Sequence, residues 1–213
     1  MSNSTAPKTL VALLVVMTAG VCPAQADVRA PGVAIRIYDG ASVDAATRGA
    51  AMRTAADIVA GGGVSAAWQD CAGGGASRRC DLARGPRDLM IRILPGAGGA
   101  PPPSPSRVVL GFAALEPASG AGVLATIYMD RVRVTARHLG LSTSVLLGRV
   151  IAHEVGHLLG SPGHTDRGMM REVWTDAQLA RDRPDDWRFT PSERSASPGG
   201  DAHTGDAEAH PSR

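Results

Sequence analysis

Residues 153–164 of the chain read His-Glu-Val-Gly-His-Leu-Leu-Gly-Ser-Pro-Gly-His. Residues four apart lie on the same face of an α-helix, so His153 and His157 can point their imidazoles at one metal ion. Glu154 is offset from that face, where it can reach a water on the metal without displacing it, as a general base must. Gly160 lets the chain leave the helix and turn back, which makes His164 the candidate for a third ligand. The spacing therefore predicts a zinc site built on a helix.

The residues around this motif are apolar. Residues 145–152 read Val-Leu-Leu-Gly-Arg-Val-Ile-Ala, and two leucines follow His157. A helix that is apolar over most of its circumference lies in the interior of a protein. Two histidines and a glutamate buried there without a metal or a hydrogen-bond partner would be costly. The alternative interpretation, two surface histidines on an ordinary amphipathic helix, fits this environment poorly.

Composition and length limit the possible functions. A chain of 213 residues can form one domain with a hydrophobic core and is too short for two large ones. The net charge is +2, aromatic residues make up 3% of the chain, and no basic run alternates with aromatic residues. A nucleic-acid surface would require such a run. We therefore expect one domain and no nucleic-acid partner, while the oligomeric state stays open.

Residues 1–26 have the parts of a bacterial export signal. Lys8 supplies the positive region, an apolar run follows it, and residues 24–26 read Ala-Gln-Ala, a small-x-small cleavage site. The apolar run is too short to span a bilayer comfortably, which argues against an uncleaved anchor. Val21 stands before Cys22 where a lipoprotein would have a small residue. We expect a cleaved signal, a secreted or periplasmic protein, and no stable membrane insertion after cleavage.

Two cysteines remain after the predicted cleavage. In an oxidising compartment Cys71 and Cys80 are expected to form a disulfide that closes a short loop. The alternative is a second metal site, but two cysteines without a nearby histidine do not make one.

Hydrophobic patterning predicts an α+β domain over residues 27–193. Alternating or β-branched runs predict strands over residues 33–38, 64–68, 89–94, 108–114 and 124–129. An Ala-rich helix is predicted over 45–60 with Ser42 as its cap, and the helix of the metal site over about 142–159. This order favours a mixed, twisted sheet packed on a central zinc-binding helix.

The C-terminal part of the chain is less regular. Residues 175–179 suit a short capped helix, and residues 190–193 read Thr-Pro-Ser-Glu, a capping-box pattern. Residues 194–213 have almost no apolar side chains and predict a disordered tail. We expect His203 and His210 in this tail to be solvated and not to bind the metal.

The segment from His153 to Met170 resembles the metzincin clan of zinc endopeptidases, in which HExxHxxGxxH is followed shortly by a methionine turn. The chain also resembles a group of secreted bacterial proteins with a minimal metzincin-type domain. That second resemblance rests on residues 68–71, 89–95, 110–113, 128–132, 153–157, 164, 168–170, 174 and 189–191. It covers nearly all of the mature chain and implies a zinc-binding peptidase fold without naming a substrate.

Carried over onto this sequence, the resemblance implies that His153 and His157 are zinc ligands and that Glu154 is the catalytic base. Met170 matches the methionine turn, which forms an apolar floor beneath the ligands. The clan places a tyrosine after this turn in some members. This chain has no Tyr beyond Tyr128, so the oxyanion must be stabilised by the zinc, a backbone amide or another group.

The third ligand departs from the clan pattern. The clan places it three positions after the glycine that ends the helix. Counted from Gly160, that position is Gly163, whereas His164 lies one residue further on. We predict His164 as the ligand because a turn absorbs one extra residue easily. Asp166 is the reserve ligand, since a carboxylate can also bind zinc.

These parts predict a secreted zinc-dependent endopeptidase in which a zinc-activated water attacks a peptide carbonyl and Glu154 moves the proton. One alternative is a gluzincin-type peptidase with Glu172 as third ligand, although such an enzyme would not need Gly160 or the paired methionines. Another is a non-catalytic secreted domain with structural zinc, which a closed four-ligand site including Asp166 would favour. Residues 124–129 are either an edge strand that pairs with an extended substrate, as in the clan, or an ordinary sheet strand.

Overall fold

A computed structural model describes residues 32–72, 80–81, 85, 88–96, 108–116, 122–161, 163–191 and 193. The predicted export signal and C-terminal tail lie outside these residues. All elements given below belong to the compact unit Pro31–Arg213. None of the helices in the described ranges is both long enough and apolar enough to cross a membrane.

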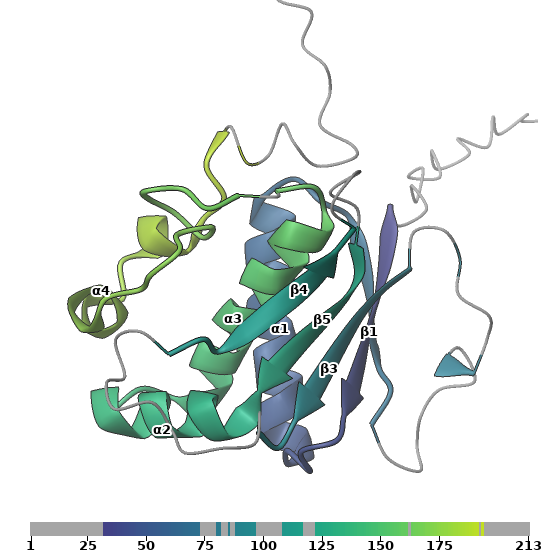
Figure 1. Cartoon of the computed structure of the whole chain (residues 1–213), viewed down its shortest axis with the longest axis horizontal. Helices are drawn as coiled ribbons and strands as arrows, with labels where there is room; N and C mark the ends of the chain where they lie inside the picture. Colours follow the sequence, from purple (N-terminus) through teal and green to yellow (C-terminus); the bar gives the residue numbers. More distant parts are fainter. Residues whose placement is uncertain are drawn as a thin grey trace, which may run out of the picture. The chain divides into compact units, whose positions relative to one another are not determined.

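A mixed five-stranded sheet forms one layer of this unit (Figure 1). Its strands are β1 (Val33–Asp39), β2 (Ala66–Asp70), β3 (Asp88–Leu94), β4 (Gly111–Leu115) and β5 (Gly122–Tyr128), in the order β2-β1-β3-β5-β4. β1 pairs in parallel with β2 and β3, β3 pairs in parallel with β5, and β4 is antiparallel to β5. β5 is therefore an interior strand. The interpretation of residues 124–129 as a substrate-pairing edge was wrong, and β4 is the strand at that edge.

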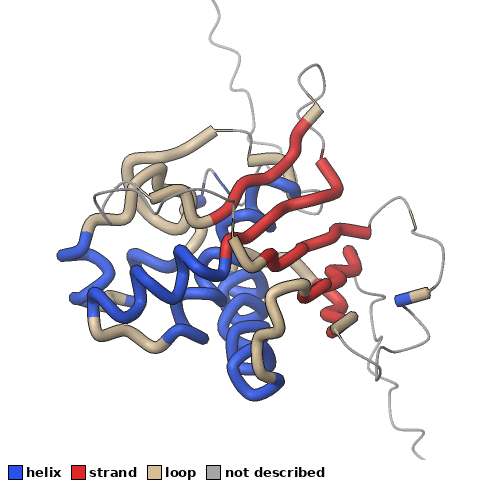
Figure 2. Tube along the Cα trace, turned by 60° about the horizontal axis from the view of Figure 1, so that its bottom comes forward, coloured by secondary structure: helices blue, strands red, loops and turns tan. Residues whose placement is uncertain are grey.

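Helices α1 (Ala45–Gly61) and α3 (Thr143–Leu158) pack on each other and against one face of the sheet. Figure 2 shows the helices gathered on one side of the strands. The isoleucines at alternate positions of β1, β3 and β5 point to this side and are fully buried: Ile35, Ile37, Ile91, Ile93 and Ile127. Alternation puts them on one face because successive side chains of a strand point in opposite directions. The predicted α+β fold with a mixed sheet on a central helix is confirmed.

The start of α1 differs from the prediction. Asp44 is the N-cap and its side chain accepts a hydrogen bond from the first turn of the helix. The Asp39 carboxylate accepts from the backbone N–H groups of Ala41 and Val43 at 2.8 and 2.7 Å. These bonds hold residues 40–43 in a turn, so the helix begins after Asp44. Ser42 lies in that turn with a φ of 53°, and its prediction as the cap was wrong.

Helix α2 (Met129–Leu139) was not predicted from the sequence. It starts directly after β5 at Tyr128, which makes no side-chain capping bond, and it ends at Gly140 with a left-handed φ of 65°. A helix without a capping side chain lacks the usual signal for its start. The short helix α4 (Asp176–Arg181) has a reciprocal capping box between Thr175 and Gln178, as its capped start led us to expect. The 3-10 turn η3 (Pro184–Trp187) follows it.

Cys71, just after β2, and Cys80 form a disulfide with a Cα–Cα distance of 5.7 Å. The predicted pairing is confirmed. It links the end of β2 to residue 80, whose carbonyl accepts a hydrogen bond from the Tyr38 hydroxyl.

Candidate metal centre

The C-terminal half of α3 carries two of the three histidines of the site. His153 and His157 lie one helical turn apart, and their Nε2 atoms are 3.2 Å from each other. His164 comes from the loop that follows the helix. Gly160 turns that loop with a φ of +106°, a conformation that side chains other than glycine rarely adopt. Each of the three histidines offers a ligand atom, and these atoms lie within 4.8 Å of one another.

Backbone carbonyls orient both histidines of the helix. His153 Nδ1 lies 2.9 Å from the Met169 carbonyl oxygen, and His157 Nδ1 lies 2.7 Å from that of Ser161. A carbonyl oxygen only accepts, so Nδ1 carries the proton in each ring and donates it. The neutral ring then has a free electron pair on Nε2, which faces the centre of the group. This pattern of outer contacts is the one found around histidines that bind metals.

Burial keeps these imidazoles neutral. Desolvation lowers the pKa of His153 to about 4, and it also lowers the pKa of His157. A neutral imidazole is the form that binds a metal, because the proton would otherwise occupy the electron pair.

Glu154 is buried beside the histidines, and its Oε2 atom has no hydrogen-bond partner among the residues that the structure describes. Desolvation raises its pKa to about 8. A methyl group on Gly111, the first residue of β4, would lie 2.8 Å from Glu154 Oε1, so the edge strand begins against this carboxylate. A buried carboxylate with an unsatisfied oxygen is costly unless a cation or a hydrogen-bonding ligand lies nearby. The site therefore has a donor set for a metal ion and an unpartnered carboxyl oxygen that a bound metal ion and its water would satisfy.

The structure brings His164, and neither Asp166 nor Glu172, into the histidine group. Both carboxylate residues are exposed on the loop. The backbone carbonyl of Asp166 accepts a hydrogen bond from Arg171 Nε at 2.9 Å. Within the described part of the chain the group thus offers three ligands and no fourth, so a zinc ion held there would keep one position for water or substrate.

Met170, the residue predicted for the methionine turn, packs against α3 at Gly156. Met169 and Met170 are fully buried. A methyl group on Gly156 would collide with Met170 Sδ, so the glycine lets the methionine reach the helix backbone. Trp174 packs edge-on against the His153 ring, with ring centroids 5.4 Å apart. Met170 thus packs against the helix that carries the histidines, and Trp174 packs against the His153 ring.

Sequence reasoning missed several residues of this site. Trp174 belonged to the resemblance, but no spacing rule gave it a role. The approach of Gly111 to Glu154 depends on how β4 pairs with β5, and no local signal in the sequence reports that pairing. The Ser161 carbonyl is a backbone group, so residue identity could not reveal it.

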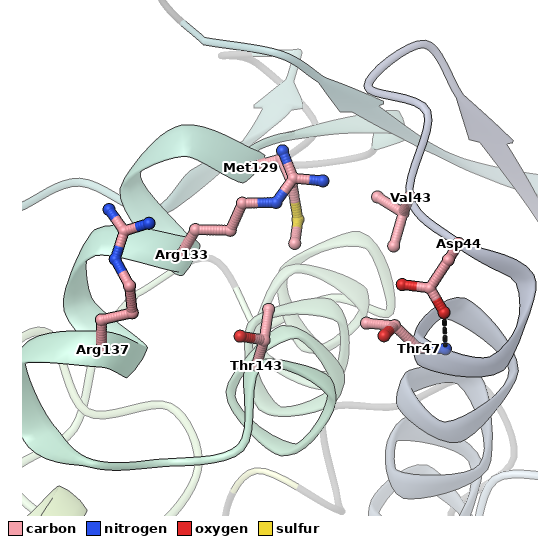
Figure 3. Close-up of a pocket in the computed structure, with 7 residues that line it drawn as sticks. All are labelled: Val43, Asp44, Thr47, Met129, Arg133, Arg137 and Thr143. Atoms are coloured by element: carbon pink, nitrogen blue, oxygen red, sulfur yellow. Dashed lines mark hydrogen bonds between the residues drawn. The ribbon is translucent and has the colours of Figure 1, made fainter.

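A separate pocket of about 260 Å³ lies near the other end of α3 (Figure 3). Figure 3 shows Arg133 and Arg137 of α2 on one side, and Thr47 of α1 with the N-cap Asp44 on the other. Thr143, the first residue of α3, contributes to its lining and precedes His153 by ten residues, about 15 Å along the helix. The pocket contains no residue of the histidine group and is not part of the metal centre.

No protein-family model and no curated protein matches this chain. Among solved structures, a zinc-dependent peptidase from Methanocorpusculum labreanum (strain Z) is similar with a TM-score of 0.50 at 16% identity, covering 76% of this chain and 98% of that one. The chain shares the fold of that peptidase. Archaemetzincin from Methanopyrus kandleri aligns with a TM-score of 0.44 at 16% identity, covering 76% of this chain and 92% of that one. The three-histidine site lies on this fold in the arrangement expected from the metzincin motif.

Proposed function

We propose that the protein is a secreted zinc-dependent endopeptidase. One observation carries the proposal: three imidazoles converge on one point, and a buried carboxylate without a hydrogen-bond partner on one oxygen lies next to them. Structural zinc sites usually have four protein ligands, whereas catalytic sites keep one position open. The three-ligand group found here favours catalysis.

His153, His157 and His164 would hold the zinc. Bound there, zinc supplies a Lewis acid that polarises a peptide carbonyl and makes water acidic near neutral pH. A cation bound by the histidines would favour the ionised form of the adjacent Glu154. The Glu154 carboxylate then accepts the proton of the attacking water, since within the described residues its Oε2 makes no competing hydrogen bond. The same carboxyl group then donates the proton to the leaving amine.

The edge strand β4 is suited to hold an extended peptide. Among the described strands it pairs only with β5, so its other edge is available for strand addition. Its first residue, Gly111, touches Glu154. A peptide added to this edge would therefore run beside the base and the histidines.

Export is supported by the sequence of residues 1–26 and by the disulfide. A Cys71–Cys80 bridge is typical of proteins outside the reducing cytoplasm. The secreted or periplasmic location is part of the proposal.

The deciding experiment measures zinc content and hydrolysis of casein or a peptide library by the purified protein. Glu154→Gln is expected to keep stoichiometric zinc and to lose hydrolysis by about 10²–10⁴-fold, because general-base catalysis contributes that much. His164→Ala is expected to lose both zinc and hydrolysis. Arg133→Ala, in the separate pocket, is the control and should retain both.

Two results would overturn the proposal. A Glu154→Gln variant with the wild-type rate would remove Glu154 from the mechanism. A wild-type protein that binds zinc through the histidines but hydrolyses no peptide would instead support the non-catalytic zinc domain.

A further inference from the structure

The loop that carries His164 is attached to a segment from a distant part of the sequence. The Met169 N–H donates to the Arg188 carbonyl oxygen at 2.9 Å. The Thr165 hydroxyl lies 2.7 Å from Glu193 Oε1. Within the loop, the Thr165 N–H donates to the Met170 carbonyl at 2.9 Å and closes it into a compact unit. Residues 188–191 and 193 therefore form the surface on which this ligand loop rests.

Gly168 makes this close approach possible. Its φ is +76°, and a methyl group there would lie 2.8 Å from the Arg188 carbonyl oxygen and 2.9 Å from Thr190 Cγ2. The loop backbone and the segment are thus in direct contact at this point. Such contact transmits a displacement of the segment to the loop.

Glu193 is the side chain that joins the two parts. It is 4% exposed, and within the described residues it forms no ion pair. Its Oε2 accepts from the Thr190 N–H at 2.5 Å, and the Glu193 N–H donates to Thr190 Oγ1 at 3.4 Å. These two bonds are the predicted capping box. A capping box uses only one carboxylate oxygen, and here the second oxygen faces Thr165, the residue after His164.

The third histidine depends on its loop more than the other two do. His153 and His157 each bond a backbone carbonyl through Nδ1. His164 makes no such bond to any described residue and is largely exposed. Among the described residues, its imidazole makes ring contacts with the other two histidines. The position of its ring is therefore set by the backbone of residues 164 and 165.

We propose that Glu193 is a positioning residue for the metal site, which holds His164 in place through the hydroxyl of Thr165. The inference rests on the metal site of the proposed function, but not on its catalytic activity. Thr165 Oγ1 also lies 2.7 Å from the Arg167 carbonyl oxygen. One hydroxyl proton serves one acceptor at a time, so Glu193 and this carbonyl share it. Loss of Glu193 leaves the loop with its internal bonds only.

The test is the zinc affinity of the full chain, measured by competition with a chelating indicator. Glu193→Ala is expected to weaken zinc binding by about 10–100-fold, the usual effect of removing an outer-shell partner. Glu193→Gln should remain within about threefold of wild type, because its amide can bond both Thr165 and the Thr190 N–H. The visible spectrum of the Co²⁺-loaded protein should change in Glu193→Ala and return in Glu193→Gln. A residue that serves only to cap the last turn would not shift that spectrum.

Two further variants complete the design. Thr165→Val removes the hydroxyl at nearly constant size and should weaken zinc binding in the same direction, even where Glu193→Ala fails to fold. Arg188→Ala is the matched control, because its carbonyl and not its exposed side chain supports the loop. Wild-type zinc affinity in both Glu193→Ala and Thr165→Val would overturn the inference. Weakened binding in these variants, with no hydrolysis by the wild type, would uphold it while rejecting the peptidase function.

Discussion

The helix half and the loop half of the metal centre are ordered in different ways. The helix half is His153, Glu154 and His157, which are fixed by the backbone of α3 and by a buried surrounding. The loop half is His164 on residues 160–170, which is exposed and follows a glycine turn. The helical repeat of α3 positions the side chains of the helix half, whereas contacts with residues distant in the sequence position the loop half.

This difference explains why the one-residue departure after Gly160 is tolerated. An extra residue inside a helix would rotate a ligand by about 100° and remove it from the site. An extra residue in the turn changes only the path of the loop, since Thr165, Gly168 and Met169 fix where the loop ends against residues 188, 190 and 193. We therefore expect substitutions in the packing against α3 to lower the free energy of unfolding. Substitutions in the turn should weaken zinc binding more than they lower stability.

The largest effect is expected for Phe189→Ala, which removes the ring beneath the helix half. Phe189 is buried, and its ring atoms would lie 2.8 Å from methyl groups on Gly62 and on Gly156. Removing a buried phenylalanine lowers the unfolding free energy by about 3–5 kcal/mol. Denaturant unfolding of the zinc-free protein measures this loss. A loss no greater than that of the surface variant Arg188→Ala, about 0.5 kcal/mol or less, would contradict the packing described for the helix half.

Gly156→Ala is expected to have the next largest effect on the helix half. Alanine favours a helix over glycine by about 1 kcal/mol, but here the new methyl group would meet Met170 Sδ and lie 2.8 Å from Phe189 Cε1. Overpacking in a core costs about 1–3 kcal/mol and outweighs the helix preference. Gly61→Ala in α1, where nothing lies within 4 Å of the added methyl group, is the matched control and should be neutral or stabilising. Equal thermal midpoints for the two variants would argue against close packing of Met170 on the helix.

The two halves also differ in how well the sequence predicted them. The spacing of His153 and His157 is a helical period, and the apolar residues around them mark burial, so the helix half followed from local pattern. His164 was predicted from the turn at Gly160 and from a resemblance, but neither gave the path of its loop. Its support by Glu193 required knowing where residues 188–191 and 193 lie. The capping-box pattern of Glu193 was recognisable, but its second partner was not.

The fold shows the same limit. Periodicity predicted the strands and the long helices, because burial on one face leaves a repeat of two or of 3.6 residues. It could not give the strand order, which placed β5 inside the sheet and β4 at its edge. Helix α2 was missed because Tyr128 gives no capping signal. The pairing of strands that are distant in the sequence, and the start of a helix without a capping side chain, leave no local pattern in the sequence.

Gly160→Ala in the loop half is expected to have the smallest effect on stability. Its effect on zinc affinity should differ sharply from that of Gly163→Ala, three residues later. Gly160 has a φ of +106°, which strains any residue with a side chain by about 1–2 kcal/mol. Gly163, three residues later, has open space around its added methyl group and no left-handed φ. Gly160→Ala should therefore weaken zinc binding by more than its small stability loss suggests, because the strained turn moves the His164 loop relative to the helix. Gly163→Ala should leave zinc affinity unchanged. If Gly163→Ala weakened zinc binding as much as Gly160→Ala, the flexibility of the whole turn, and not the conformation at Gly160, would set the position of the third ligand.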